Sequence, residues 1–353
     1  MKGLYIHSPF CPKKCPYCDF YSLPFSSFVA ENFYNETLRR IALLTEEFDT
    51  LYFGGGTPSL LGTDKINNII SSVNLSKNAE ITLESNPNID FSKWKNTKIN
   101  RLSLGLQSAN DDELAFLGRN HNKQKAINCI KSAKDVGIKN ISLDLMIGTP
   151  KMTNDSLLTS IEFCLEQDVT HISSYILKIE ENTAFYDRQD SLDLPCDERI
   201  SSLYLFMVGA LKNRGFNQYE ISNFCKDEHY SRHNLKYWNC EEYSALGPSA
   251  HSFENGKRAF FPRDLDYYLS GKPVLFDSFG GDFKELAMLK LRLCKGLSKS
   301  DCDNFNNNYF SAIIQNTQKI PQDYINIKEN NISLTPKGFL LSNAIIVKLL
   351  ENI

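Results

Sequence analysis

The sequence lacks the long apolar runs that cross membranes. Its longest apolar segment, YLFMVGAL at 204–211, is far shorter than the roughly 20 residues that span a bilayer. The amino-terminal stretch MKGLYIHSPF has no basic region followed by a sustained apolar run, so no signal peptide is predicted. We therefore expect a cytoplasmic protein without a membrane span.

The sequence also lacks basic runs, internal repeats and low-complexity tracts. Its 39 Lys and Arg residues are scattered and are outnumbered by 42 Asp and Glu residues, which gives a formal net charge of -3. This charge gives no electrostatic reason to expect nucleic-acid binding. The length of 353 residues predicts about two domains of ordinary soluble composition.

Cysteines are few and far apart, with one exception. Of the ten, seven are isolated and are most simply buried apolar residues of a reducing compartment: Cys129, Cys164, Cys196, Cys225, Cys240, Cys294 and Cys302. The other three, Cys11, Cys15 and Cys18, form a CxxxCxxC motif directly after the apolar run LYIHSPF.

The three clustered thiolates predict a metal centre in a rigid loop that contains Pro12 and Pro16. Iron–sulfur clusters normally take four cysteine ligands, so three would hold a [4Fe-4S] cube with one iron open. The alternatives are a zinc site completed by His7 or Asp19, and plain buried thiols.

Strand-like and helix-like patterns alternate through the first half of the chain. Six strand–helix units predict a parallel sheet covered by helices, which is a partial (β/α)6 barrel in an α/β fold. The expected strands are 4–7, 50–53, 80–84, 101–106, 140–147 and 170–179. An irregular aromatic-rich stretch at 219–261 follows, and then helices at 284–293 and 299–306, a hairpin at 325–334 and a helix at 336–350. This last part resembles a winged helix, for which we expect a structural role because no basic recognition face is present.

Polar residues follow several of these strands, at the end of the sheet where parallel α/β folds bind ligands. GGGTPS at 54–59 allows close approach of a ligand to the backbone, although alone it is equally consistent with a tight turn. Glu84, Gln107, Arg119 and Asp144 lie at or after other strand ends. A buried charge is costly unless paired, so these side chains either face a ligand, lie on a solvated rim or form a salt bridge.

A second motif is SRHNLKYW at 231–238. A histidine beside aromatic residues suits a haem pocket, but a packed aromatic cluster with a hydrogen-bonded histidine is equally common. No CxxCH motif occurs, so c-type covalent attachment is not indicated.

Together these motifs resemble a known family. CxxxCxxC with an aromatic residue before the third cysteine, here Tyr17, is similar to the radical S-adenosylmethionine (SAM) superfamily, whose core is a partial barrel and whose open iron chelates SAM. YIHSPFCPKKCPYCDF resembles the oxygen-independent coproporphyrinogen III oxidase family, above all its HemW-type branch of haem chaperones.

The resemblance implies a site for each of three cofactors. It assigns Cys11, Cys15 and Cys18 to the [4Fe-4S] cluster. It assigns haem to the complete HNxxYW string, with His233 on the iron and Asn234, Tyr237 and Trp238 around the porphyrin; Cys225 and Cys240 lie nearby. It assigns SAM to Tyr5, Tyr17, Gly55, Gly56, Thr57, Glu84, Gln107, Arg119 and Asp144.

The function implied is a haem chaperone that loads an acceptor protein, with a barrel domain at 1–220 and a HemN-type domain at 221–353. The alternative is a coproporphyrinogen III dehydrogenase, which decarboxylates propionates. That enzyme typically has a further cysteine where this chain has Phe20, and a segment before the first strand. Further partners implied are an electron donor such as a flavodoxin and a second copy in a homodimer.

Overall fold

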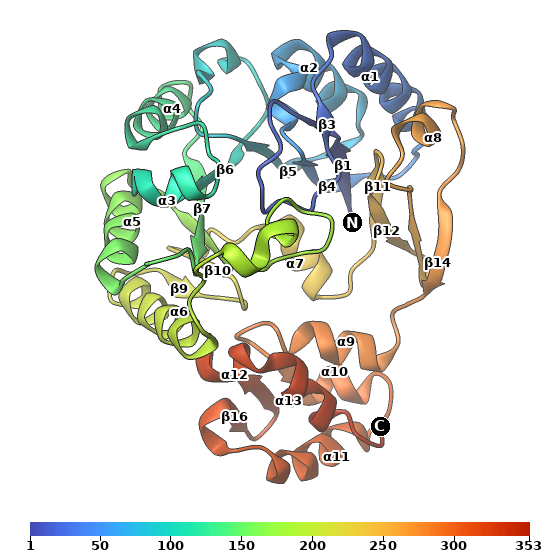
Figure 1. Cartoon of the computed structure of the whole chain (residues 1–353). Coiled ribbons are helices and arrows are strands. Elements are labelled where there is room, and N and C mark those ends of the chain that lie inside the picture. Colours follow the sequence, from blue (N-terminus) through green and yellow to red (C-terminus); the bar gives the residue numbers. More distant parts are fainter.

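Six parallel strands form the core of the computed structural model, which describes all residues 1–353. They lie side by side in the order of the sequence, and helices cover the outer face of the sheet (Figure 1). An α-helix follows every one of these strands except the third, which is followed only by the short 3-10 helix Phe91–Trp94. The strands are β1 (Lys2–Ser8), β4 (Phe48–Gly55), β5 (Leu75–Ser85), β6 (Arg101–Gln107), β7 (Asn140–Ile147) and β8 (His171–Ile176). The main covering helices are α1 (Ser27–Ile41), α2 (Thr63–Ser72), α3 (Asp111–Phe116), α4 (Lys123–Asp135), α5 (Asn154–Glu166) and α6 (Asp197–Lys212). The predicted partial (β/α)6 barrel is confirmed.

The helices cover the sheet because their apolar residues recur at helical spacing. In α4, for example, the buried residues are Ala126, Cys129, Ile130 and Ala133, which share one face. The strands are buried on both sides, as expected for a parallel sheet between a helical layer and a barrel interior. Of the isolated cysteines, Cys196 is exposed, contrary to expectation, because it stands at the start of α6.

Further strands extend the sheet at both ends; the first strand beyond β1 is parallel to it, and the other added strands pair antiparallel with their neighbours. Next to β1 lie β11 (Tyr243–Leu246), β12 (His251–Glu254), β13 (Lys257–Phe260) and β14 (Leu275–Phe279); next to β8 lie β10 (Asn223–Cys225) and β9 (Asn217–Gln218). The outermost strand, β14, is exposed along its whole length. Because β14 and β9, the two edge strands of the sheet, do not pair with each other, the barrel is open.

The stretch 219–261, expected to be irregular, contains most of these strands and α7 (Arg232–Trp238). Strands of three or four residues are too short to show a period in the sequence. The domain boundary expected after residue 220 falls between β9 and β10 of one sheet. We therefore propose that the first unit extends to about residue 280.

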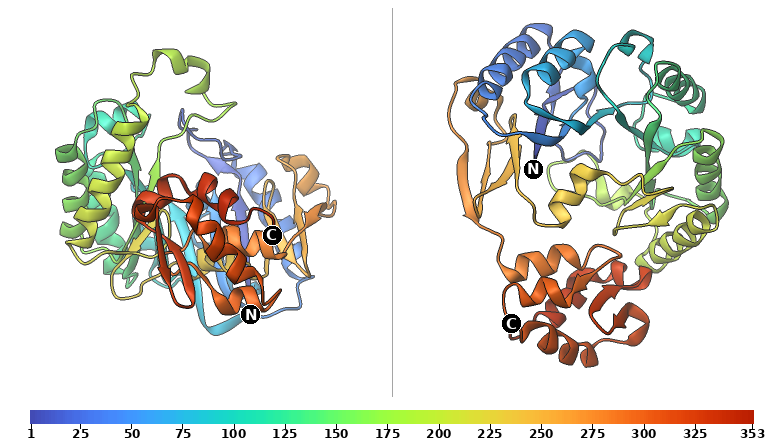
Figure 2. Two further views of the ribbon diagram at one scale, coloured as in Figure 1. Left: turned by 90° about the horizontal axis from the view of Figure 1, so that it is seen from below. Right: turned by 180° about the vertical axis from the view of Figure 1, so that it is seen from behind.

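The rest of the chain forms a small helical unit below the open side of the ring (Figures 1 and 2). It contains α9 (Phe283–Lys290), α10 (Lys299–Asp303), α11 (Tyr309–Asn316), α12 (Pro336–Leu340) and α13 (Ser342–Leu349), with a sheet of β15 (Leu297–Ser298), β16 (Ile325–Lys328) and β17 (Asn331–Leu334). The helix expected at 336–350 is broken at Leu341, and α11 was not expected. The hydrogen bond from Ile221 N to Arg292 O ties this unit to the barrel.

The remaining elements are short: β2 (Phe10–Cys11), β3 (Leu23–Pro24), α8 (Leu265–Leu269) and the 3-10 helices Pro58–Leu61, Phe91–Trp94, Tyr186–Ser191, Thr317–Lys319 and Gln322–Tyr324. None of the helices combines the length and the apolar character needed to cross a bilayer.

Candidate functional site

A cavity of ≈ 480 Å³ opens at the carboxyl ends of the parallel strands. This volume is within the range of about 300–1,000 Å³ that is usual for small-molecule sites. It is lined by the three clustered cysteines and by eight further predicted residues: Tyr17, Gly55, Gly56, Thr57, Glu84, Gln107, Arg119 and Asp144. The barrel thus brings together residues that lie up to 133 positions apart, from Cys11 to Asp144.

The cysteine loop fits a cluster better than a single metal ion. No three His, Cys, Asp or Glu side chains of the chain converge on one point, whereas in a cubane each cysteine binds a different iron. Of the two zinc partners considered, His7 is already engaged, since its ring nitrogens bond to Tyr5 OH and to Tyr21 O. Burial raises the pKa of the Cys11 and Cys18 thiols, so a bound cation is needed to hold them as thiolates.

A chain of hydrogen bonds links two of these cysteines across the cavity. Cys11 Sγ lies 3.3 Å from Thr57 Oγ1, which accepts a hydrogen bond of 3.1 Å from Asn86 Nδ2. Asn86 Oδ1 in turn accepts from Arg119 Nη2 at 2.6 Å, and Arg119 Nη1 lies 3.4 Å from Cys15 Sγ. A fixed cation beside Cys15 stabilises negative charge on the sulfur and on any anionic ligand bound there.

Glycines make room on two sides of this cavity. Gly55 has a φ of +105°, and a Cβ on Gly56 would lie 2.4 Å from Phe10 O, so no larger residue fits there. Similarly, a Cβ on Gly105 would lie 3.0 Å from Gln107 Nε2 and 3.2 Å from Arg119 Nη2. These glycines therefore allow the chain to pack closely around the cavity that they line.

Two carboxyl groups share the floor of the cavity. Glu84 accepts hydrogen bonds from Tyr52 OH at 2.7 Å and Gly55 N at 3.2 Å, and Asp144 accepts from Ser103 Oγ at 3.2 Å. Burial, with a further contribution from the charge of Asp144, raises the pKa of Glu84 to about 7. Burial likewise raises the pKa of Asp144 to about 6. A cationic group placed between them would relieve this cost.

Unpaired polar atoms also point to a missing ligand. Gln107 Oε1 and Arg119 Nε are buried and have no partner within the chain, which is unfavourable unless a ligand supplies one. Gln107 is held in the left-handed region at φ 69°, where the pairing of β6 with β7 shifts register. Such strain is typical of ligand-binding positions. These features fit a small, polar, charged molecule such as SAM beside the cysteines.

The structure separates Tyr5 from this group. Its hydroxyl bonds to His7 Nδ1 at 3.1 Å, and it lines a neighbouring cavity instead. Sequence reasoning in turn missed Asn86, Ser103, Gly105 and Tyr175, which line the main cavity. Asn86 has the same signal as Glu84, a polar side chain at the end of β5, and could have been found by it; Ser103 lies inside β6 and carries no such signal.

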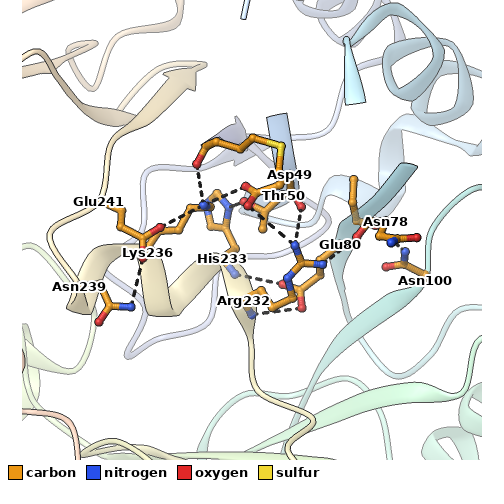
Figure 3. Close-up of polar contacts among 12 residues, drawn as sticks. Asp49, Thr50, Asn78, Glu80, Asn100, Arg232, His233, Lys236, Asn239 and Glu241 are labelled. Carbon is orange, nitrogen blue, oxygen red and sulfur yellow. Dashed lines mark hydrogen bonds and ion pairs between the residues drawn. The ribbon is translucent and has the colours of Figure 1, made fainter. Parts of the chain in front are cut away.

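His233 lines neither of these two cavities; it is buried near the amino end of β4. Its Nδ1 lies 2.7 Å from Thr50 Oγ1 (Figure 3). Its Nε2 lies 2.7 Å from Tyr237 OH. Burial lowers its pKa to about 3, so the ring is neutral and both nitrogens are engaged. In this arrangement His233 has no free nitrogen for a haem iron. It lies instead in a packed aromatic cluster with Tyr52 and Tyr237, which is the alternative to a haem pocket that the sequence left open.

The helix that carries His233 is fixed to the strands around it (Figure 3). The buried carboxylate of Glu80 accepts the backbone N–H groups of Arg232 and His233, both at 3.1 Å. Lys236 pairs with Asp49 at 2.8 Å and donates to Met1 O. Through these contacts helix α7 holds together the residue before β1 and the strands β4 and β5. The role of the helix here is therefore structural. Of the other motif residues, Tyr237 lines the neighbouring cavity, whereas Asn234 and Trp238 do not.

We therefore expect His233→Ala to lower the free energy of unfolding by about 2–4 kcal/mol. The change leaves the hydroxyls of Thr50 and Tyr237 unpaired inside the protein. Denaturation in urea measures the effect, with His229→Ala as the exposed control. A His233→Ala variant with unchanged stability but no haem binding would instead restore the ligand role.

Comparison with known proteins places this geometry in a family. Residues 5–164 match the radical SAM superfamily. The chain is 34% identical to the heme chaperone HemW of Buchnera aphidicola from Schizaphis graminum, covering 98% of this chain and 97% of that protein. It is 32% identical to the heme chaperone HemW of Bacillus subtilis, covering 98% of both.

The fold matches a solved structure as well. Coproporphyrinogen III oxidase (HemN) from Escherichia coli, a radical SAM enzyme, superposes with a TM-score of 0.83 over 99% of this chain and 90% of that one. At 19% identity this likeness concerns the fold alone. The full-length relatives, together with the three cysteines around a barrel-end cavity, decide the assignment: the chain belongs to the HemW family of the radical SAM superfamily.

Proposed function

We propose that this chain is a haem chaperone, which binds haem and passes it to an acceptor protein, and that it contains a [4Fe-4S] cluster chelated by SAM. The observation that carries the proposal is similarity over the full length to relatives named heme chaperones. The complete HNxxYW string and the phenylalanine at position 20 further support a carrier over a dehydrogenase.

In this proposal Cys11, Cys15 and Cys18 hold the cluster, whose open iron binds SAM. The remaining residues of the cavity position SAM. Glu84 and the backbone at Gly55 and Gly56 receive its amino group, because a buried carboxylate of raised pKa gains from a cation. Arg119 stands beside Cys15 and suits the carboxylate of SAM. Gln107, with its unpaired amide oxygen, supplies a further contact.

The test uses the full-length chain, reconstituted anaerobically with iron and sulfide. Titration with hemin is expected to give one Soret-absorbing haem per chain, and mixing with excess apomyoglobin as a scavenger should release that haem. Incubation with coproporphyrinogen III, SAM and dithionite should yield no protoporphyrinogen. Formation of protoporphyrinogen, or failure to bind hemin, would overturn the proposal.

A further inference from the structure

A second cavity, of ≈ 290 Å³, adjoins the first. Asp19 and Phe20 line both cavities, so the loop that carries the cysteines forms the wall between them. The walls of the second cavity are rich in aromatic rings: Phe20, Tyr21, Tyr237 and Tyr243. Flat aromatic faces of this kind suit a flat apolar ligand.

One histidine in this cavity is free to bind a metal. Of the six histidines, His7, His121, His171 and His233 have ring nitrogens in hydrogen bonds. His251, at the start of β12, is exposed and stacks on Phe260 at 5.5 Å, which fixes its ring without engaging a nitrogen. The other exposed histidine, His229, lies outside this cavity.

A cation stands at the same cavity. Arg263 is about half exposed at 51%, and its Nη2 lies 3.1 Å from Asp19 Oδ1. An exposed pair of this kind is weak, so a ligand carboxylate can compete for the guanidinium. An imidazole, a cation and aromatic walls are the three groups that recognise an iron porphyrin with propionate side chains.

We propose that His251 is the axial ligand of the haem carried by this chain, with Arg263 as the partner of a propionate. This inference rests on the proposed function and replaces His233 as the ligand. It also explains how the HNxxYW string takes part: Tyr237 lines the cavity, and His233 Nε2 holds its hydroxyl at 2.7 Å. Because the cavity has a volume of only ≈ 290 Å³, a haem bound there would be partly exposed, which suits a ligand that must be handed on.

The test is a hemin titration of the reconstituted full-length chain followed by its Soret band. We expect His251→Ala to weaken hemin binding by about tenfold or more and to shift the Soret band, and free imidazole to restore both. The matched control is His229→Ala, which removes the other exposed histidine and should bind hemin like the parent chain.

A second pair of measurements tests Arg263. Arg263→Gln should weaken the binding of hemin but not that of hemin dimethyl ester, which has no free carboxylate. If the parent chain binds hemin and His251→Ala binds it with the same affinity and spectrum, this inference is overturned while the proposed function stands. If the parent chain binds no hemin, the proposed function itself has failed.

Discussion

Replacing Cys15 by serine is expected to remove the cluster, so that iron and sulfide fall from about four of each per chain to nearly none. The cavity offers no cysteine to take its place, since Cys11 and Cys18 are the only others among the lining residues. SAM binding should be lost with the cluster, because the open iron is its main anchor in this proposal. Iron and sulfide analysis and EPR after anaerobic reduction measure the change.

The matched control is Cys196→Ser, because Cys196 is exposed and lies outside the cavity. It should retain its full content of iron and sulfide. A Cys15→Ser variant with undiminished iron would show that the sulfur is not a ligand, and a parent chain purified with zinc and no sulfide would remove the basis of the SAM assignment.

Replacing Glu84 by glutamine is expected to weaken SAM binding by about 100-fold, because a buried charge partner of the amino group is lost. In the parent chain the same interaction depends on pH. Since the pKa of Glu84 is raised to about 7 before SAM binds, affinity should fall as the pH drops below about 7. Calorimetric titration with SAM at several pH values, with the exposed Glu181→Gln as control, tests both points.

The same substitution should make the SAM-free protein more stable at pH 8. The folded chain binds the Glu84 proton more tightly than the unfolded chain does, so the stability it contributes is fully present below pH 4.5 and is lost as the pH rises through about 7. Glutamine removes this dependence. The free energy of unfolding of Glu84→Gln should therefore exceed that of the parent chain at pH 8 and differ little from it at pH 5. In the binding experiment, a Glu84→Gln variant that binds SAM as tightly as the parent chain would contradict the assignment of Glu84 to the amino group of SAM.

Sequence reasoning was most successful where long-period patterns and dense motifs coincide. The six parallel strands were found from their apolar runs, and the cavity residues Glu84 and Gln107 were found because they stand at or next to the ends of such strands. The rule that ligands gather at the carboxyl ends of parallel strands then predicts that they meet. Asp144 lies inside β7 and Arg119 lies in the loop between α3 and α4, so these two were assigned by the family resemblance.

It was least successful where the outcome depends on packing. The HNxxYW motif could not reveal that His233 lies between Thr50 and Tyr237, because that arrangement arises from contacts between segments 183 residues apart. The stretch that ends at His251 follows the HNxxYW motif, but the sequence could not show that this histidine is exposed and stacked on Phe260, because that depends on packing. Likewise, the strands β11 to β13 could not be predicted, because four residues are too few to show the two-residue alternation of a strand.

The open edge of the sheet affects how this protein can be handled. On β14 both faces are exposed, Phe276 and Phe279 among them at 57% and 77%, and one side of the strand has no neighbour. Unpaired main-chain groups beside exposed aromatic rings form a template onto which another extended segment can add. Concentrated solutions of the chain will consequently be prone to edge-to-edge association, and a charged residue in place of either phenylalanine is a rational way to keep it dispersed.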